Sequence, residues 1–145
     1  MKNRILFCFI AMVVLLGTGC RKYPDGPNFS LIPKEQRIAQ TWQVDQLYRN
    51  DIEETDAYEA FTMVFTAGGR FTWTLDLPNV DPISVAADWE LASVKEQIKL
   101  TFDDKDPVSG ETRLLFMDIR RLTQDELWLY YLTEGDYYLV RLKRA

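Results

Sequence analysis

The side chains that most often carry out chemistry are scarce in this sequence of 145 residues, which holds no histidine and two cysteines, Cys8 and Cys20. Without histidine, neither a Ser-His-Asp nor a Cys-His arrangement for nucleophilic catalysis can form, and the usual zinc ligand sets are incomplete. The candidates that remain are carboxylates, Cys20 and the aromatic side chains.

One short stretch groups four carboxylates, at Asp103, Asp104, Asp106 and Glu111. Calcium takes about six to eight oxygen ligands, so such a cluster is one way to build a calcium site. A calcium-binding EF-hand loop has a ligand and a glycine at positions where this chain has Val108 and Ser109. We therefore predict a solvated acidic loop, with no metal site and no cofactor.

Other acidic residues fall within segments of alternating apolar and polar residues, on the polar positions: Asp45, Asp76, Asp88 and Glu90. Strand side chains alternate between two faces, so these carboxylates are expected on the outside of the fold. A glycosidase needs two carboxylates facing one pocket, and the inward positions here are nearly all apolar. We predict that the protein is not an enzyme.

The first 20 residues have a different pattern from the rest. Lys2 and Arg4 precede an apolar run over residues 5–16, and small residues separate this run from Cys20. The order is typical of a secretory signal, and the run is shorter than the roughly 20 residues of a membrane-spanning helix. The small residues before Cys20 resemble a bacterial lipoprotein signal. That resemblance implies removal of residues 1–19 and acylation of Cys20, which would attach the chain to a membrane.

Removal of this segment takes away Cys8 and two of the 17 basic residues. The chain from Cys20 onward then has 15 basic against 22 acidic residues, a net charge of −7, and no internal disulfide. No clustered basic face is visible, so we expect no nucleic-acid partner. Residues 20–33 contain three prolines and no periodicity, which predicts a tether, and residues 34–145 form one domain.

That domain is predicted to begin with a short helix over residues 34–40 and to continue as strands of period two. Trp42, Val44 and Tyr48 are expected on the inner face of the first strand. A three-residue loop over 67–69 would pair Phe65 with Phe71, and its last residue, Gly69, supplies the left-handed backbone that this turn needs. A four-residue turn over 133–136 would pair Tyr131 with Tyr138.

The strand pattern predicts an all-β fold of about eight antiparallel strands with short turns, and we favour an up-and-down barrel because closure removes the sheet edges. Residues 34–143 are similar to the lipocalin-like lipoproteins of Bacteroidetes-type bacteria. The similarity rests on Trp42, the FTAGGRFTWTLD hairpin, the ADWEL strand and the RLTQDELWLYY–DYYLVRLK ending. True lipocalins carry Gly-x-Trp in the first strand with a basic side chain over the tryptophan. Here Gln40 replaces the glycine, and Arg144 is the candidate cover.

The same resemblance bears on location. An acidic pair directly after the cysteine resembles a surface-export signal in these bacteria, whereas Arg21 and Lys22 follow Cys20 here. We therefore expect a protein anchored by lipid in the outer membrane and facing the periplasm.

Aromatic residues dominate the predicted inner face, and a barrel of eight strands can hold one small molecule. The first hypothesis is a module that binds a small hydrophobic or aromatic ligand, and the alternative is that the rings only fill the core. We favour a core filled at one end with a shallow pocket at the other. The candidate ligand-binding residues are Trp42, Phe71, Trp73, Trp89, Tyr131 and Tyr138.

Further aromatic residues fall on the outer face of the last hairpin and form a strip of Trp128, Tyr130, Leu132, Tyr137 and Leu139. The tether residues Phe29, Leu31 and Ile32 are apolar enough to cover this strip. If they do not, the strip is a candidate partner site, centred on Trp128, Tyr130 and Tyr137. The second hypothesis is then an accessory subunit of an envelope protein complex, or an inhibitor.

Overall fold

The computed structural model describes residues 31–145. The predicted signal segment, Cys20 and most of the tether lie outside this range. Two short 3₁₀ helices, Thr55–Ala57 and Ser93–Lys95, accompany one α-helix and nine strands. In chain order these are α2 (Lys34–Ile38), β1 (Thr41–Arg49), β2 (Ile52–Glu53), β3 (Phe61–Phe65), β4 (Arg70–Leu75), β5 (Ile83–Ala92), β6 (Gln97–Lys105), β7 (Thr112–Leu122), β8 (Glu126–Thr133) and β9 (Asp136–Arg144).

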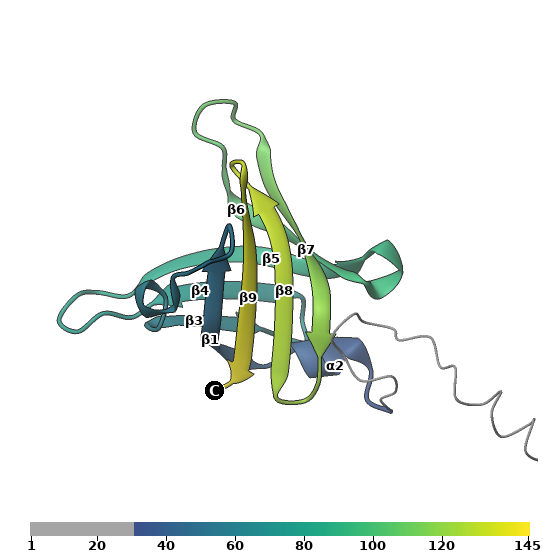
Figure 1. Ribbon diagram of the computed structural model, residues 1–145. Coiled ribbons are helices and arrows are strands. Elements are labelled where there is room, and N and C mark those ends of the chain that lie inside the picture. The colour runs from purple at the N-terminus through teal and green to yellow at the C-terminus, as the bar shows by residue number, and fades with distance from the viewer. Residues whose placement is uncertain (1–30) are drawn as a thin grey trace, which may run out of the picture.

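The strands form one antiparallel sheet that closes on itself (Figure 1). Neighbours follow one another from β3 to β9, and β1 pairs with both β3 and β9, so eight strands make a complete barrel. The two-residue β2 is an extra strand that pairs with the end of β1. The predicted all-β barrel with a short helix before the first strand is confirmed.

Alternation along the strands places the apolar side chains inside, where the core forms. The predicted pairings Met63–Trp73 and Phe65–Phe71 are confirmed, and Gly69 has φ +82°. Tyr131 pairs with Tyr138 as predicted. The turn after β8 has two residues rather than four, because the pairing continues through Thr133 and Asp136. The register is unchanged because both strands lengthen equally.

Strand β1 departs from the predicted alternation. Its pairing with β9 shifts between Val44 and Gln46, so that one extra residue is inserted. Leu47 is therefore buried, and Tyr48 lies on the outer face beside Arg141, whose guanidinium carbon is 5.6 Å from the centre of the tyrosine ring. The prediction that Tyr48 faces inward is wrong for this reason.

Helix α2 closes one end of the barrel, at the bottom of Figure 1. It ends at Ile38, two residues before the predicted end, and Ile38 is fully buried. The Trp42 indole N–H donates to the Ile38 carbonyl oxygen at 3.0 Å, and an Arg37 guanidinium N–H donates to the Leu122 carbonyl oxygen at 2.6 Å. Arg144, the predicted cover for Trp42, lies opposite it in the β1–β9 pairing but is exposed. The buried arginine at this end is thus Arg37.

Within residues 31–145, no helix has the length and hydropathy needed to cross a membrane.

Candidate functional site

A cup of about 370 Å³ opens at the end of the barrel away from α2, near the β8–β9 turn at the top of Figure 1. Strands β4 to β9 all contribute to its wall. Five of its lining residues are aromatic: Tyr58, Trp73, Phe102, Tyr131 and Tyr138. The volume lies near the lower end of the range of roughly 300–1,000 Å³ for small-molecule sites, which suits a compact ligand.

Strand pairing brings the rings of the cup together. Tyr131 and Tyr138 are directly opposed in β8 and β9, and their rings stack with centroids 5.0 Å apart and planes 10° apart. On the other side, Phe61 lies between Tyr58 and Trp73, at centroid distances of 5.3 Å and 5.2 Å. The aromatic wall is therefore held in place by its own contacts.

One polar atom in this wall lacks a partner. The indole nitrogen of Trp73 is buried, and no acceptor for its N–H lies among residues 31–145. An indole N–H can only donate, and a buried donor without an acceptor is costly. The same burial keeps this nitrogen out of contact with solvent, so it belongs to the packed side of the wall.

Two tyrosines of the cup, Tyr131 and Tyr58, are held in the neutral form. Burial raises the pKa of Tyr131 well above its usual range, and the nearby Tyr138 and Tyr58 hydroxyls add to the rise. Burial is also the largest cause of the raised pKa of Tyr58. Both hydroxyls are therefore available as hydrogen-bond donors at neutral pH.

Beneath the cup the barrel is nearly filled. A void of about 20 Å³ lies under it and shares Trp73, Phe102, Leu115 and Tyr131 with the cup wall. Phe71 and Met63 line the same void from below. The structure thus has the arrangement favoured from the sequence, a filled core with a shallow pocket at one end.

The six residues predicted to bind ligand divide between the two ends. Trp73, Tyr131 and Tyr138 line the cup, and Phe71 lies beneath it at 2% exposure. Trp42 is fully buried under α2. Trp89 donates its indole N–H to the Thr66 carbonyl oxygen at 2.9 Å and meets the Phe65 ring edge-on. The structure therefore places three of the six at one pocket.

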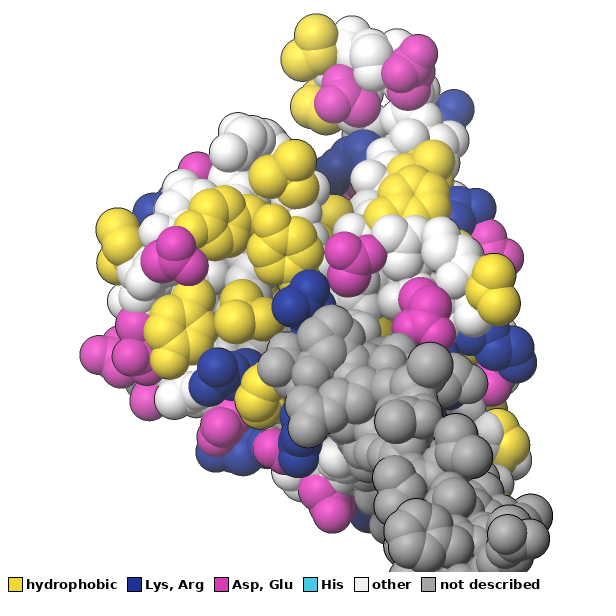
Figure 2. Space-filling view, turned by 45° about the vertical axis from the view of Figure 1, so that its right-hand side comes forward, with side chains coloured by type: hydrophobic (Ala, Val, Ile, Leu, Met, Phe, Trp, Pro, Cys, Tyr) yellow, Lys and Arg dark blue, Asp and Glu magenta, His cyan; other side chains and the backbone are white. Residues whose placement is uncertain are grey.

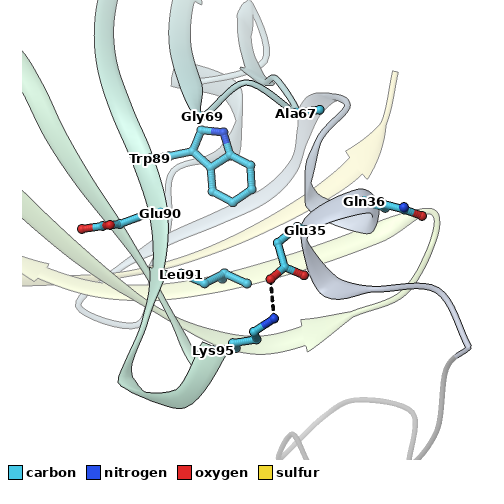
Figure 3. A pocket seen from close by; sticks show the side chains of 8 residues that line it. All are labelled: Glu35, Gln36, Ala67, Gly69, Trp89, Glu90, Leu91 and Lys95. Atoms are coloured by element: carbon cyan, nitrogen blue, oxygen red, sulfur yellow. Dashed lines mark hydrogen bonds and ion pairs between the residues drawn. The ribbon is translucent and has the colours of Figure 1, made fainter.

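A second hollow, of about 470 Å³, lies beside α2 at the closed end (Figure 3). Its Trp89 indole faces the space between β5 and the helix, and Glu35 and Lys95 meet across it with Oε1 and Nζ 2.5 Å apart. Lys34 lies nearby and donates to the Lys95 carbonyl oxygen and to Glu96. The hollow is larger than the cup, but these polar groups already have partners. We therefore interpret the hollow as the seam where α2 covers the barrel.

Arg113 also lines the cup, although it was not among the predicted ligand-binding residues. Its guanidinium carbon lies 5.0 Å from the centre of the Phe102 ring. It stands two residues before Leu115 and four before Met117, which line the void from the inner face of β7. Strand β7 has apolar residues on both of its faces, so the sequence did not show which face points inward. Counting back from Met117 would have placed Arg113 inward.

Acidic side chains stand away from the interior. Asp45, Asp76, Asp88 and Glu90 are all exposed, as the alternation predicted. In the predicted acidic loop, Asp106 accepts hydrogen bonds from the backbone N–H groups of Val108 and Ser109 at 2.8 Å and 2.7 Å, which lower the pKa of its carboxyl. Within residues 31–145, no group of three or more His, Cys, Asp or Glu side chains is placed to hold a metal ion.

The predicted partner strip does lie on the outer face, and Figure 2 shows hydrophobic side chains gathered on one side of the molecule among Lys and Arg. Two guanidinium groups lie over the Trp128 ring. The guanidinium carbon of Arg141 is 4.4 Å from the ring centre, and that of Arg121 is 5.3 Å from it. Tyr137 donates its hydroxyl to Asp51. Leu31 is 88% exposed and covers nothing, and Phe29 lies outside the described residues. The partner role remains a prediction.

The fold is similar to two solved structures from Bacteroides. A lipocalin-like protein from Bacteroides uniformis ATCC 8492 has a TM-score of 0.55 and 16% sequence identity, over 75% of this chain and 99% of that one. An uncharacterized protein from Bacteroides eggerthii DSM 20697 has a TM-score of 0.53 and 15% sequence identity, and the match covers 72% of this chain and 98% of that one. No protein-family model and no curated protein matches the sequence. At these identities the likeness shows the fold, so the barrel is lipocalin-like.

Proposed function

We propose that this chain is a membrane-anchored lipoprotein whose barrel binds a compact apolar or aromatic molecule in the cup at its open end. The observation that carries the proposal is the cup itself. It combines an aromatic wall built from many strands with a buried Trp73 N–H that has no acceptor among the described residues.

Binding without catalysis is the role that this wall supports best. The carboxylates of the strands face outward, and Glu134, in the exposed turn after β8, is the one acidic residue in the lining of the cup. General acid–base chemistry needs positioned groups that exchange a proton near the working pH. Tyr131, with its raised pKa, holds its proton there.

The anchoring part of the proposal rests on the sequence. The apolar run followed by small residues and Cys20 supplies the attachment, and Arg21 and Lys22 favour the periplasmic side of the outer membrane. The tether leads directly to α2, which covers the closed end of the barrel. The cup at the other end is then free to exchange its ligand.

Binding can be tested by filling the cup. N-phenyl-1-naphthylamine, a neutral aromatic probe, is expected to fluoresce in the presence of the purified protein and to quench Trp73. Val85 lines the cup and Ser84 is its exposed neighbour on the other face of β5. Val85→Trp should abolish probe binding by occupying the space, whereas Ser84→Trp should bind the probe as the wild type does.

Near-ultraviolet circular dichroism shows whether both variants remain folded. Failure of the folded wild-type protein to bind the probe, or equal binding by the two tryptophan variants, would contradict the proposed site.

A further inference from the structure

Arg113 is the one cationic side chain in the lining of the cup. Arg49, Arg70 and Arg121, by contrast, each form an ion pair with Asp or Glu on the surface. Arg113 has no ion pair with any carboxylate in residues 31–145, and its contact is with the face of Phe102 at 5.0 Å. A positive charge therefore stands in the aromatic lining of the cup and has no ion-pair partner in the described part of the chain.

Two acids, Asp106 and Glu134, lie nearby, and within residues 31–145 neither forms an ion pair with Arg113. Asp106 accepts the backbone N–H groups of Val108 and Ser109, which are the main cause of its lowered pKa, and the charge of Arg113 adds a smaller contribution. Glu134 lies in the turn after β8, the strand that pairs with β7, so it stands at the same end of the barrel as Arg113. The chain from Cys20 onward carries a net charge of −7, so the molecule as a whole repels anions. An anion would be attracted to the cup only by a local cation, and Arg113 is placed to be that cation.

Hydrogen bonding points the same way. Arginine can donate but not accept, and the same is true of the Trp73 indole. These two residues lie on β7 and β4, at different parts of the wall. Because the Trp73 nitrogen is closed to solvent, Arg113 is the donor that a ligand can reach. A ligand that suits the cup then carries an anionic oxygen group for Arg113 on a body apolar enough for the aromatic rings.

We propose that the cup selects compact, ring-containing organic anions, such as aromatic carboxylates or sulfonates, with Arg113 as the anion contact. This inference rests on the proposed function, because it names the class of ligand for the same cup. The planar guanidinium, held against Phe102, presents a fork of donors that matches a carboxylate or sulfonate group.

Two fluorescent probes that share one ring system test the proposal. 8-Anilinonaphthalene-1-sulfonate is N-phenyl-1-naphthylamine with an added sulfonate group. We expect the wild-type protein to bind the sulfonate more tightly than the neutral probe. Arg113→Gln should weaken sulfonate binding about tenfold, in line with the loss of one charge-assisted hydrogen-bonded contact, and leave neutral-probe binding within about twofold.

Two further variants serve as controls. Arg144→Gln removes one positive charge from an exposed position at the closed end and should leave both affinities unchanged. Arg113→Lys should keep most of the affinity for the sulfonate, which separates the charge from the shape of the side chain. Near-ultraviolet circular dichroism confirms that each variant is folded before binding is measured.

Each other result overturns a defined part of the argument. If Arg113→Gln weakens both probes equally, Arg113 supports the wall and does not select anions. Equal loss of sulfonate binding in Arg113→Gln and Arg144→Gln would show a general charge effect. If the wild type binds the neutral probe as tightly as the sulfonate, the anion preference fails and the binding site stands. If it binds neither probe, the proposed function itself fails.

Discussion

Tyr131 joins the core to the cup. Its side chain is 8% exposed and stacks on Tyr138, and it lines both the cup and the small void beneath. Burial raises the pKa of its hydroxyl because the ionised form would lose its hydration. The folded state therefore holds this proton more tightly than the unfolded chain does.

The raised pKa makes stability fall at alkaline pH. Below about pH 10, the unfolded value, Tyr131 is neutral in both states and adds no pH dependence. Above it the unfolded chain loses the proton while the fold retains it, so the free energy of unfolding decreases by up to about 1.4 kcal/mol per pH unit. Tyr131→Phe should make this decrease shallower in urea unfolding followed from about pH 9 to 11. Tyr130→Phe, on the outer face, controls for loss of a tyrosine, and equal slopes in wild type and Tyr131→Phe would refute the assignment.

At the scale of the element, the β3–β4 turn depends on one glycine. Gly69 has φ +82°, where a side chain is strained, and its carbonyl oxygen accepts the Trp89 backbone N–H at 2.7 Å. A Cβ at Gly69 would lie 3.5 Å from the Trp89 carbonyl oxygen, an ordinary contact, so the cost of adding it is mainly conformational.

Gly69→Ala is therefore expected to lower the free energy of unfolding by about 1–2 kcal/mol in urea denaturation. Gly68→Ala is the matched control, because Gly68 lacks the left-handed angle and a Cβ there approaches only the Thr66 hydroxyl, at 3.8 Å. It should leave stability unchanged or slightly raised through a less flexible unfolded chain. The prediction fails if the two alanine variants are equally stable.

How far the sequence predicts these elements depends on local regularity. The β3–β4 and β8–β9 registers were predictable, because alternation on both strands leaves one pairing that keeps apolar residues together. The register shifts in β1 and β7 could not be predicted, because no residue type in the sequence marks an inserted residue. Tyr48 and Leu47 show the effect, because a single insertion exchanges which of them faces inward.

The site was half predictable for a related reason. Alternation identifies which aromatic residues face inward, and Trp73, Tyr131 and Tyr138 were found in this way. It does not tell which end of the barrel each one occupies. That depends on where α2 closes the barrel, so Trp42 and Trp89 were grouped with the cup although they lie at the other end.

For the whole molecule, the position of α2 sets the direction of the cup. Residues 31–33 lead directly into this helix, so the chain enters the barrel at its closed end, away from the cup. A flexible segment of the length of residues 21–33 spans roughly 20 Å, less than the length of about 30 Å that a nine-residue strand such as β9 covers. Under the proposed anchoring, the closed end stands near the membrane and the cup faces away from it.

This orientation can be measured with two single-cysteine labels on the membrane-bound protein, since the proposed acylation would occupy Cys20 and the proposed processing would remove Cys8. Val94 is 94% exposed beside α2, and Val108 is 95% exposed in the β6–β7 hairpin at the open end. In vesicles that carry a headgroup quencher, a fluorophore at Val94→Cys should be quenched more strongly than one at Val108→Cys.

In a second experiment, Cys20→Ala should no longer be recovered with membranes. Persistent membrane recovery of Cys20→Ala would exclude the anchor, whereas equal or reversed quenching would exclude the orientation alone.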